Sequence, residues 1–353
     1  MKELITCLMC LLALVAADPT CSCHSVVENN SWPWGDNIIS KWNRVTIGDS
    51  VARSCDGAAA VLFENVTTSK ITDPLAYCGK QLPILEKPIQ HMWIRDSNFG
   101  RLVPSPKVAV MRISDTNFTK LIFDNTVTYQ TQRIYLKNVP LDAIPKNLNA
   151  MQNLVSFVAK EIPLQKFILS QFNGLNKLQR ITISNNLTSI AIGAADLPAL
   201  ISLNFHSNQI EKVPGDISTL KSLEMLNFCF NKITHLDMSV FNGLDFLQDL
   251  KISHNPLLII NSPTTVNLPA LQHLHLQHSH LERLDVALWH MPKLASMNLN
   301  WNNLTQVANL EGQFPKGAIV YAAGNTWNCT WLNEAATVVV IDQQDRPRCK
   351  NLA

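Results

Sequence analysis

Four of the chain's ten histidines fall within one short stretch, LQHLHLQHSHLERL (residues 271–284). His273 and His275 stand two residues apart, so on a strand their side chains point to the same side. His278 follows them, and His254 holds the corresponding place 24 residues earlier. This spacing is able to hold zinc, but no Asp, Glu or Cys of that strand completes a ligand set. The alternatives are imidazoles that titrate together near pH 6.5 and a polar surface with no such role.

Cys229 is the second candidate for chemistry, because His206 of the preceding segment is expected beside it. A thiol next to an imidazole outlines a nucleophile. Catalysis also needs an oxyanion hole, an orienting group and a cleft, which a flat strand surface does not offer. We therefore predict a binding protein and not an enzyme, with no catalytic residue, bound metal or cofactor. Cys229 is then either a free thiol or, as the odd cysteine of a secreted chain, an interchain disulfide partner.

The elements that position these residues follow a repeat, L-x-x-L-x-L-x-x-N-x-L. Copies begin at Leu200, Leu223, Leu247, Leu271 and Leu294, at intervals of 23, 24, 24 and 23 residues, and Ser279 replaces Asn in the fourth. Weaker copies begin at Ile89, Val108, Thr131, Leu154 and Leu178. This spacing is the pattern of leucine-rich repeats. Each L-x-L centre predicts a short strand with inward apolar side chains, and stacked units bury what one unit cannot. We expect the α/β class: a leucine-rich repeat solenoid (horseshoe) with a concave parallel β-sheet.

The two ends of the chain predict secretion and capping. Residues 1–17 have the charged start, short apolar run and small residues of a signal peptide, and no later run is long enough to span a membrane. We expect a cysteine-containing N-terminal cap at 18–88, about ten repeats at 89–316 and a C-terminal cap at 317–353. Cys21, Cys23, Cys55 and Cys78 allow three pairings in the first cap, and Cys329 with Cys349 fits one bridge in the second. The net charge of +2 argues against binding to nucleic acid or to a membrane surface.

The stretch GNTWNCTWL (residues 324–332) carries a more specific resemblance. Its N-x-W-x-C pattern after the last repeat resembles the C-terminal flank of extracellular leucine-rich repeat proteins, which include Toll-type receptors, matrix proteoglycans and insect immune proteins. With the signal peptide and about ten repeats, the chain looks most like the secreted leucine-rich repeat immune proteins of mosquitoes, in a form without their coiled coil. That resemblance implies a role in humoral innate immunity, recognition of a microbial surface or a complement-like thioester protein, and pairing as a homodimer or as a heterodimer with another repeat protein.

Function is expected on the concave face, whose residues alternate with the inward leucines. The predicted ligand-binding residues are Trp93, Arg95, Arg112, Arg133, Tyr135, Lys137, His206, Phe230, Lys251, His254, His273, His275, His278 and Trp301. The first half of this face is basic, and Phe230 and Trp301 are candidate anchors because exposed aromatic residues are enriched at interfaces. Either a protein or a microbial glycan fits such a face. The competing classes are an extracellular matrix or adhesion protein and, more weakly, a hydrolase that uses the His/Cys patch.

Six sequons predict glycosylation of a secreted chain, at Asn29, Asn65, Asn117, Asn186, Asn303 and Asn328. Asn117, Asn186 and Asn303 follow the turn position of their repeats, where the chain leaves the strand. In the irregular unit that begins at Leu178, Asn185 is expected to hold the turn position itself. Glycans there would cover one rim of the solenoid and leave the strand face open.

Overall fold

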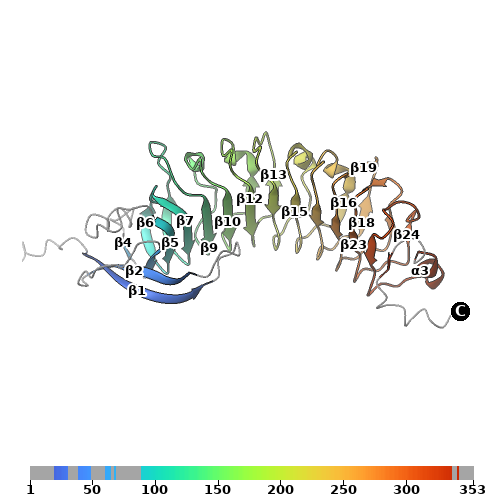
Figure 1. Cartoon of the computed structure of the whole chain (residues 1–353), viewed down its shortest axis with the longest axis horizontal. Helices are drawn as coiled ribbons and strands as arrows, with labels where there is room; N and C mark the ends of the chain where they lie inside the picture. The colour runs from blue at the N-terminus through green and yellow to red at the C-terminus, as the bar shows by residue number, and fades with distance from the viewer. Residues whose placement is uncertain are drawn as a thin grey trace, which may run out of the picture. The chain divides into compact units, whose positions relative to one another are not determined.

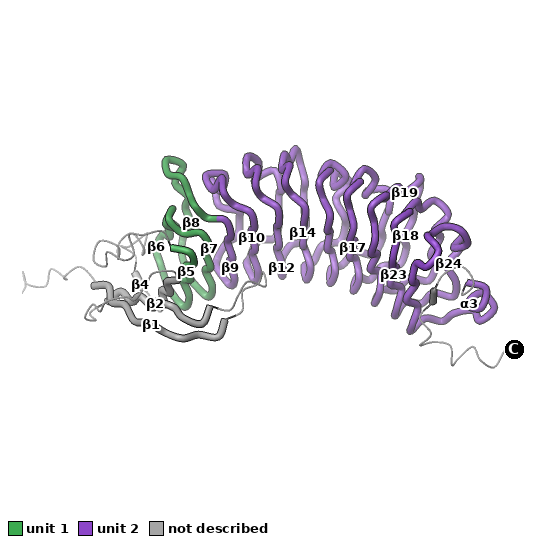
Figure 2. Tube along the Cα trace, viewed as in Figure 1, with its two compact units in different colours: residues 1–131 green, residues 132–353 purple. Residues whose placement is uncertain are grey.

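The computed structural model describes residues 89–335 in full, and residues 20–30, 39–48, 60–64, 67–68 and 340–341 as strands. The predicted signal peptide, Asn65, Cys55, Cys78 and Cys349 lie outside the described residues. The chain divides into two compact units, residues 1–131 and residues 132–353 (Figure 2). The predicted bridges of both caps therefore stay predictions.

Unit 1 begins with an antiparallel pair, β1 (Thr20–Asn30) and β2 (Ile39–Gly48). Parallel pairing then runs from β2 to β3 (Ala60–Glu64), β5 (Ile89–Arg95) and β7 (Val108–Ser114). A second parallel sheet consists of β4 (Thr67–Thr68), β6 (Asn98–Leu102) and β8 (Asn117–Leu121). The unit thus combines an N-terminal hairpin with strands of the repeat type.

Unit 2 contains one strand per repeat, joined in a parallel sheet (Figure 1). These strands are β9 (Arg133–Lys137), β10 (Ser156–Lys160), β12 (Arg180–Ser184), β14 (Ser202–Asn204), β15 (Met225–Asn227), β17 (Asp249–Lys251), β20 (His273–His275), β23 (Ser296–Asn298), β25 (Ile319–Tyr321) and β26 (Val340–Ile341). In Figure 2 this unit is an arc, and these strands line its inner side. The predicted parallel sheet of a leucine-rich repeat solenoid is confirmed.

The return path of each repeat lies on the opposite side of unit 2 and uses short elements. Its strand pairs are β11 (Lys166–Ile168) with β13 (Ser189–Ala191), β16 (His235–Asp237) with β18 (Ile259–Asn261), β19 (Val266–Asn267) with β22 (Trp289–His290), and β21 (Leu284–Asp285) with β24 (Val307–Ala308). Four 3-10 helices lie between them: η2 (Leu148–Ala150), η3 (Leu169–Phe172), η4 (Gly215–Thr219) and η5 (Met238–Phe241).

The α/β class predicted from the repeat needs correction. Within the described residues the only α-helix is α3 (Cys329–Ala335), which follows the last full repeat. A unit of 23 or 24 residues spends about half its length on the strand and turn, and the rest must cross the unit. Extended or 3-10 backbone covers more distance per residue than an α-helix does. Among the described residues, no helix is long and apolar enough to cross a membrane.

The core of unit 2 is built from the middle residue of each short strand. Leu203, Leu226, Leu250, Leu274, Met297 and Val320 occupy matched positions of neighbouring strands and are all buried. A row of buried phenylalanines crosses several repeats beside them: Phe157, Phe172, Phe167, Phe205 and Phe228, with successive ring centroids 5.2–5.7 Å apart. Each unit therefore fills space left by its neighbours.

Buried asparagines close the turn after β14, β15, β17, β23 and β25. Asn231 shows the pattern: its Nδ2 donates to the carbonyl oxygens of Phe205 (2.9 Å) and Phe228 (3.0 Å), and its Oδ1 accepts from the Ile210 amide (3.0 Å). The same arrangement recurs at Asn208, Asn255, Asn302 and Asn325. Each amide satisfies backbone groups that the turn leaves unpaired in a buried place.

Ser279 interrupts this asparagine ladder, and its buried hydroxyl has no hydrogen-bond partner. We expect Ser279→Asn to restore the missing bonds and to raise the free energy of unfolding by about 0.5–1.5 kcal/mol. Chemical denaturation of the two proteins in parallel measures this difference. An unchanged or lower stability would show that the cavity around Ser279 does not accept a carboxamide.

Candidate binding face

The outward positions of the unit 2 strands form one surface, which we call the sheet face. On the three-residue strands the middle side chain is buried, and the flanking ones are at least partly accessible except for Ser202 of β14, as in Asp249–Leu250–Lys251 of β17. The parallel register places Asp249 beside His273, and Lys251 beside His275. Side chains from successive repeats therefore line up across the sheet.

The sheet face is basic. Its outward strand positions carry Arg133, Lys137, Lys160, Arg180 and Lys251. The acids among these positions and the turns that follow are Asp249 and Glu161, and Glu161 lies 3.5 Å from Lys137 Nζ. Five cations thus face two carboxylates, both of which are already in ion pairs, so the surface favours an acidic partner.

The histidines of β20 are held by neighbours from adjacent repeats. His273 Nδ1 lies 2.9 Å from Ser296 Oγ, and His275 Nε2 lies 3.4 Å from Asp249 Oδ1. Lys251 Nζ contacts the other oxygen of Asp249 at 2.8 Å. Burial alone would raise the pKa of Asp249, but bonding to His275 and Lys251 outweighs it and the pKa lies below its usual value. Asp249 is therefore a charged partner of His275 at neutral pH.

Sequence reasoning did not find Asp249, because the search was confined to the strand that carries His273 and His275. Aligning β17 with β20 by their repeats would have placed the carboxylate beside them. Within the described part of the chain, no group of three or more His, Cys, Asp or Glu side chains is arranged to hold a metal ion.

Phe230, His254, His278 and Trp301 form an aromatic stack along the edge of the sheet face. The ring centroids of Phe230 and His254 are 4.0 Å apart, those of His254 and His278 4.4 Å, and those of His278 and Trp301 5.9 Å. Adjacent rings are parallel to within 8–14°. Phe230 and Trp301 are 52% and 58% exposed, so the stack lies at the surface.

All four rings of the stack stand on left-handed backbone, with φ between 53° and 57°. Each occupies the position directly before a ladder residue, and Gly324 (φ 71°) holds that position in the next repeat. Left-handed backbone costs a residue other than glycine roughly 1–2 kcal/mol, least for Asn and Asp. Parallel ring contacts return about 0.5–1.5 kcal/mol each. The aromatic residues are thus at best neutral for stability where asparagine would be favourable.

Two predicted face residues are buried, which corrects their assignment. Trp93, in unit 1, is only 5% exposed: the Arg95 and Arg112 guanidiniums cover its ring at 4.6 and 4.2 Å from the centroid, and its Nε1 donates to Ser114 Oγ (2.8 Å). Tyr135, in unit 2, is also 5% exposed. Large rings at outward positions are covered by the long side chains that surround them, so alternation alone does not give exposure.

Cys229 is free and buried, with its Sγ 2.9 Å from Ser253 Oγ. Burial raises the pKa of its thiol above the usual value, against a smaller opposing effect of Ser253. Such a thiol is a poor nucleophile at neutral pH. His206, its neighbour one repeat back, is engaged elsewhere, with Nδ1 2.8 Å from Ser207 Oγ. The geometry favours the free-thiol interpretation over an interchain bridge or a nucleophile.

Two histidines of the sheet face make stability depend on pH. Burial lowers the pKa of His206 and of His254, helped by the positive charges of Lys160 and His278 respectively. The unfolded chain then binds more protons than the folded chain just below pH 6.5, so stability must fall as pH falls through that range. We expect a smaller loss between pH 7.5 and 5.5 for His206→Gln/His254→Gln than for wild type, by urea denaturation. Equal losses in both proteins would contradict this assignment.

The described sequons differ in their surroundings. Asn117 and Asn303 are exposed, whereas Asn186 Nδ2 donates to the Ile162 carbonyl at 2.6 Å. Asn328 Oδ1 accepts from the amides of Thr330 and Trp331 at the start of α3. Asn185 is exposed on left-handed backbone (φ 99°), and the half-buried Asn186 makes the bond to the preceding repeat, which corrects the expected placement of Asn185 at the turn position. Glycosylation itself stays a prediction.

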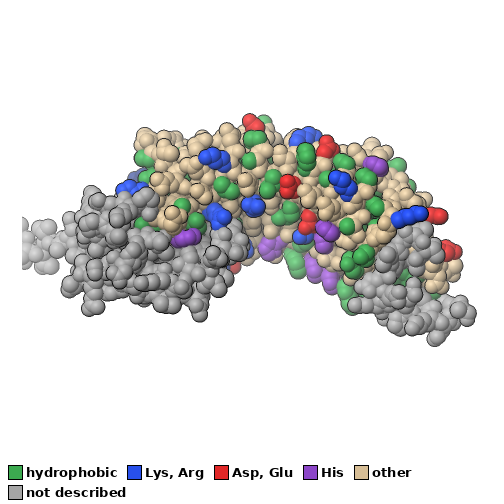
Figure 3. Space-filling model, viewed as in Figure 1, with side chains coloured by type: hydrophobic (Ala, Val, Ile, Leu, Met, Phe, Trp, Pro, Cys, Tyr) green, Lys and Arg blue, Asp and Glu red, His purple; other side chains and the backbone are tan. Residues whose placement is uncertain are grey.

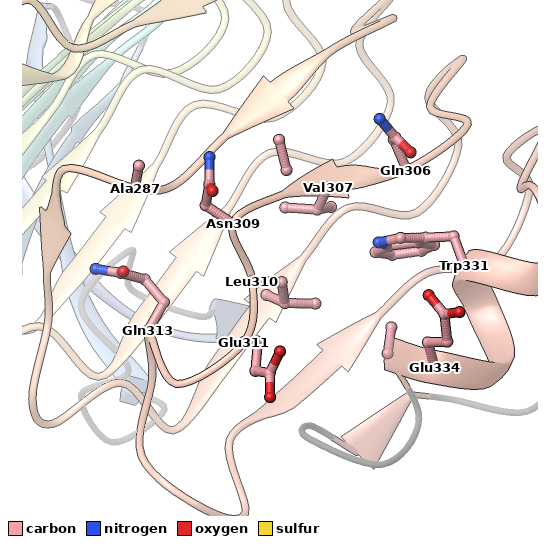
Figure 4. A pocket seen from close by; sticks show the side chains of 11 residues that line it. Ala287, Gln306, Val307, Asn309, Leu310, Glu311, Gln313, Trp331 and Glu334 are labelled. Atoms are coloured by element: carbon pink, nitrogen blue, oxygen red, sulfur yellow. The ribbon is translucent and has the colours of Figure 1, made fainter.

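A pocket near the C-terminal end of unit 2 lies away from the sheet face. Its lining comes from β24 and the residues on either side of it, from α3 and from the segment between β21 and β22 (Figure 4): Ala287, Gln306, Val307, Ala308, Asn309, Leu310, Glu311, Gln313, Trp331, Glu334 and Ala335. Trp331 stacks on Trp327 at 4.9 Å, and two carboxylates face the opening. Residues 336–339, which follow α3, are outside the described residues, so we assign the pocket no role.

The parallel sheet with one strand per repeat and the buried asparagines at its turns define the fold as a leucine-rich repeat solenoid. Residues 198–257 and 222–281 match the family model described as leucine rich repeat. Toll-like receptor 3 of Bos taurus is 28% identical over 158 residues, which cover 41% of this chain and 17% of the receptor. Lumican of Rattus norvegicus is 25% identical over 225 residues, which cover 59% of this chain and 64% of lumican. The alignments thus span less than two thirds of these relatives.

Among solved structures, similar folds occur in mosquito leucine-rich repeat proteins. The leucine-rich repeat domain of APL1B is 16% identical, with a TM-score of 0.56 over 80% of each chain. The LRIM1/APL1C complex is 13% identical, with a TM-score of 0.55 over 83% of this chain and 56% of that one. These structures have the leucine-rich repeat fold that the repeat pattern of this chain predicts.

Proposed function

We propose that this chain is a secreted, glycosylated binding protein of humoral innate immunity, which recognises a macromolecular ligand through the sheet face. The basic, aromatic-edged sheet face carries this proposal. A surface built from rigid, repeated strands suits a large partner rather than a small substrate. The ligand classes are a microbial surface or a complement-like thioester protein, and no cofactor takes part.

The similarity to the LRIM1/APL1C complex supports one further feature, assembly with a second leucine-rich repeat chain. Because Cys229 is buried, such assembly need not use it as a bridge. We propose a non-covalent homodimer or heterodimer. In size-exclusion chromatography it should elute at the size of a dimer, and reductant should not change that size.

The matrix alternative rests on the similarity to lumican. An immune recognition protein should circulate in body fluid and increase on infection, whereas a matrix protein should resist extraction from tissue. The thiol form of the hydrolase alternative is disfavoured, since Cys229 and His206 bond to serines and burial raises the pKa of the thiol.

Affinity purification from extracellular fluid of the source animal, followed by mass spectrometry, tests the proposed function. The bait is the full chain, and the control bait carries Lys137→Glu/Arg180→Glu/Lys251→Glu on the sheet face. We expect a macromolecule that is recovered with wild type and lost with the control. Recovery of nothing, or of the same proteins with both baits, would contradict binding through the sheet face.

A further inference from the structure

The aromatic stack is not required by the backbone that carries it. The main-chain amides of Phe230, His254, His278 and Trp301 donate to carbonyls of the next repeat, those of Ser253, Gln277, Asn300 and Ala323, at 2.7–3.0 Å. Ser207, at the same position one repeat earlier, makes the equivalent bond to Cys229 without a ring. The left-handed turn therefore forms with or without an aromatic side chain.

The residues chosen for this position differ along the chain. In the earlier repeats this left-handed position is held four times by Asp or Asn, at Asp96, Asp115, Asn138 and Asn185, and otherwise by Glu161 and Ser207. The four successive repeats of the stack use Phe, His, His and Trp; His tolerates such backbone as Asp and Asn do, but Phe and Trp do not. Backbone strain retained at an exposed position is a reason to look for a function there.

The chain also makes room for the last ring. A Cβ atom built on Gly324 would lie 2.6 Å from Trp301 Cε3, so the indole rests against a repeat that has no side chain at this place. Trp301 is thereby held parallel to His278 while its outer edge stays accessible. Figure 3 shows histidine and hydrophobic side chains gathering along this inner side of unit 2.

The geometry of the stack selects among partners. Sugars bind aromatic residues through ring faces, and here the faces between the four rings are occupied by the neighbouring rings, while Gly324 lies against the outer side of Trp301. What remains exposed is a row of ring edges, which carry partial positive charge, and imidazole nitrogens, which donate or accept hydrogen bonds. Carboxylates and the faces of other aromatic rings are the complementary groups.

The charge that complements an acidic partner comes from the sheet face as a whole, whose cations outnumber its carboxylates. Lys251 and His275 both approach Asp249, so the one carboxylate on these strands is already paired. His273 is exposed next to them. Exposed Phe and Trp beside such a surface are the residue types that anchor protein interfaces.

We propose that the aromatic stack of Phe230, His254, His278 and Trp301 is a docking ridge for a protein segment that presents carboxylates together with aromatic or other apolar side chains. This deepens the proposed function and rests on it, because it names the partner chemistry of the same sheet face. The stack supplies the apolar contact, and Lys251 with Arg180, Lys160 and the other cations of the sheet face supplies the charge.

A defined probe tests the ridge: a short peptide of alternating glutamate and tyrosine, compared with a lysine–tyrosine peptide of the same length and a heparin fragment. We expect wild type to bind the acidic peptide and Phe230→Asn/Trp301→Asn to bind it about tenfold or more weakly. Phe230→Tyr, which keeps the ring, should bind as wild type does. Phe246→Asn is the matched control, since Phe246 is 62% exposed outside the sheet face.

Asparagine suits left-handed backbone, so the double variant should unfold within about 4 °C of wild type. Should it be less stable, Lys251→Gln gives a second measurement with every ring intact, and we expect about threefold weaker binding of the acidic peptide. Equal affinity of wild type and both variants for that peptide would overturn the proposal. So would stronger binding of the basic peptide, or heparin binding that alone depends on the rings, which would indicate a glycan site.

The same double variant separates this proposal from the proposed function. If wild type recovers a partner from extracellular fluid and Phe230→Asn/Trp301→Asn recovers it equally well, the ridge is wrong and the binding function stands. If wild type recovers nothing, the binding function itself is wrong.

Discussion

Asn231→Ala is expected to lower the free energy of unfolding by about 2–4 kcal/mol. The substitution leaves the Ile210 amide buried without its acceptor and removes one donor each from the carbonyls of Phe205 and Phe228. Those carbonyls keep a second donor, from Asn208 and Asn255 respectively, so the orphaned Ile210 amide accounts for most of the cost. Urea denaturation followed by circular dichroism measures the effect.

Lys232→Ala is the matched control, because Lys232 follows Asn231 directly and its side chain is exposed. Its Nζ contacts Gln209 Oε1 at 3.1 Å on the surface, where deletion of a side chain changes stability by about 0.5 kcal/mol or less. A loss at Lys232 as large as at Asn231 would mean that the turn, and not the buried carboxamide, determines stability here.

The asparagine ladder illustrates how much of the fold the sequence predicts. The repeat period, the inward leucines and the turn-closing Asn follow from strand alternation and from the need to pair buried backbone groups. They predict the parallel sheet of unit 2 and the interruption at Ser279. The α/β class failed because spacing fixes the length of the return path and says little about its conformation; β11, β13 and η3 are as compatible with that length as a helix.

The binding face was harder to predict, for two physical reasons. The alternation of side chains along a strand predicts the side of the sheet on which a side chain lies, but not which neighbours cover it. Trp93 and Tyr135 were therefore expected to be exposed, and they are buried. The second reason is that the repeat register was used for His254 and His278 but was not extended to Phe230 and Trp301. All four residues directly precede the position that the turn-closing Asn, or Ser279, occupies. Aligning the repeats at this position would have predicted that the four rings lie next to one another.

The second large effect is expected from Phe205→Ala, which should lower the free energy of unfolding by about 3–5 kcal/mol. Phe205 is fully buried, with its ring centroid 5.5 Å from that of Phe167 and 5.6 Å from that of Phe228. Alanine leaves a cavity between these two rings. Phe246→Ala deletes the same atoms from a mostly exposed site and should cost about 0.5 kcal/mol or less.

Because each repeat packs mainly on its neighbours, this damage should be local rather than global. Hydrogen exchange should increase first in β12, β14 and β15, which lie around Phe205, while β23 and β25 stay protected. Phe230 lies three residues after the end of β15, so the near end of the aromatic stack should loosen while Trp301, beyond β23, keeps its place. Uniform loss of protection along unit 2 would instead show that the solenoid unfolds as one cooperative body, and that its binding surface is only as stable as the whole.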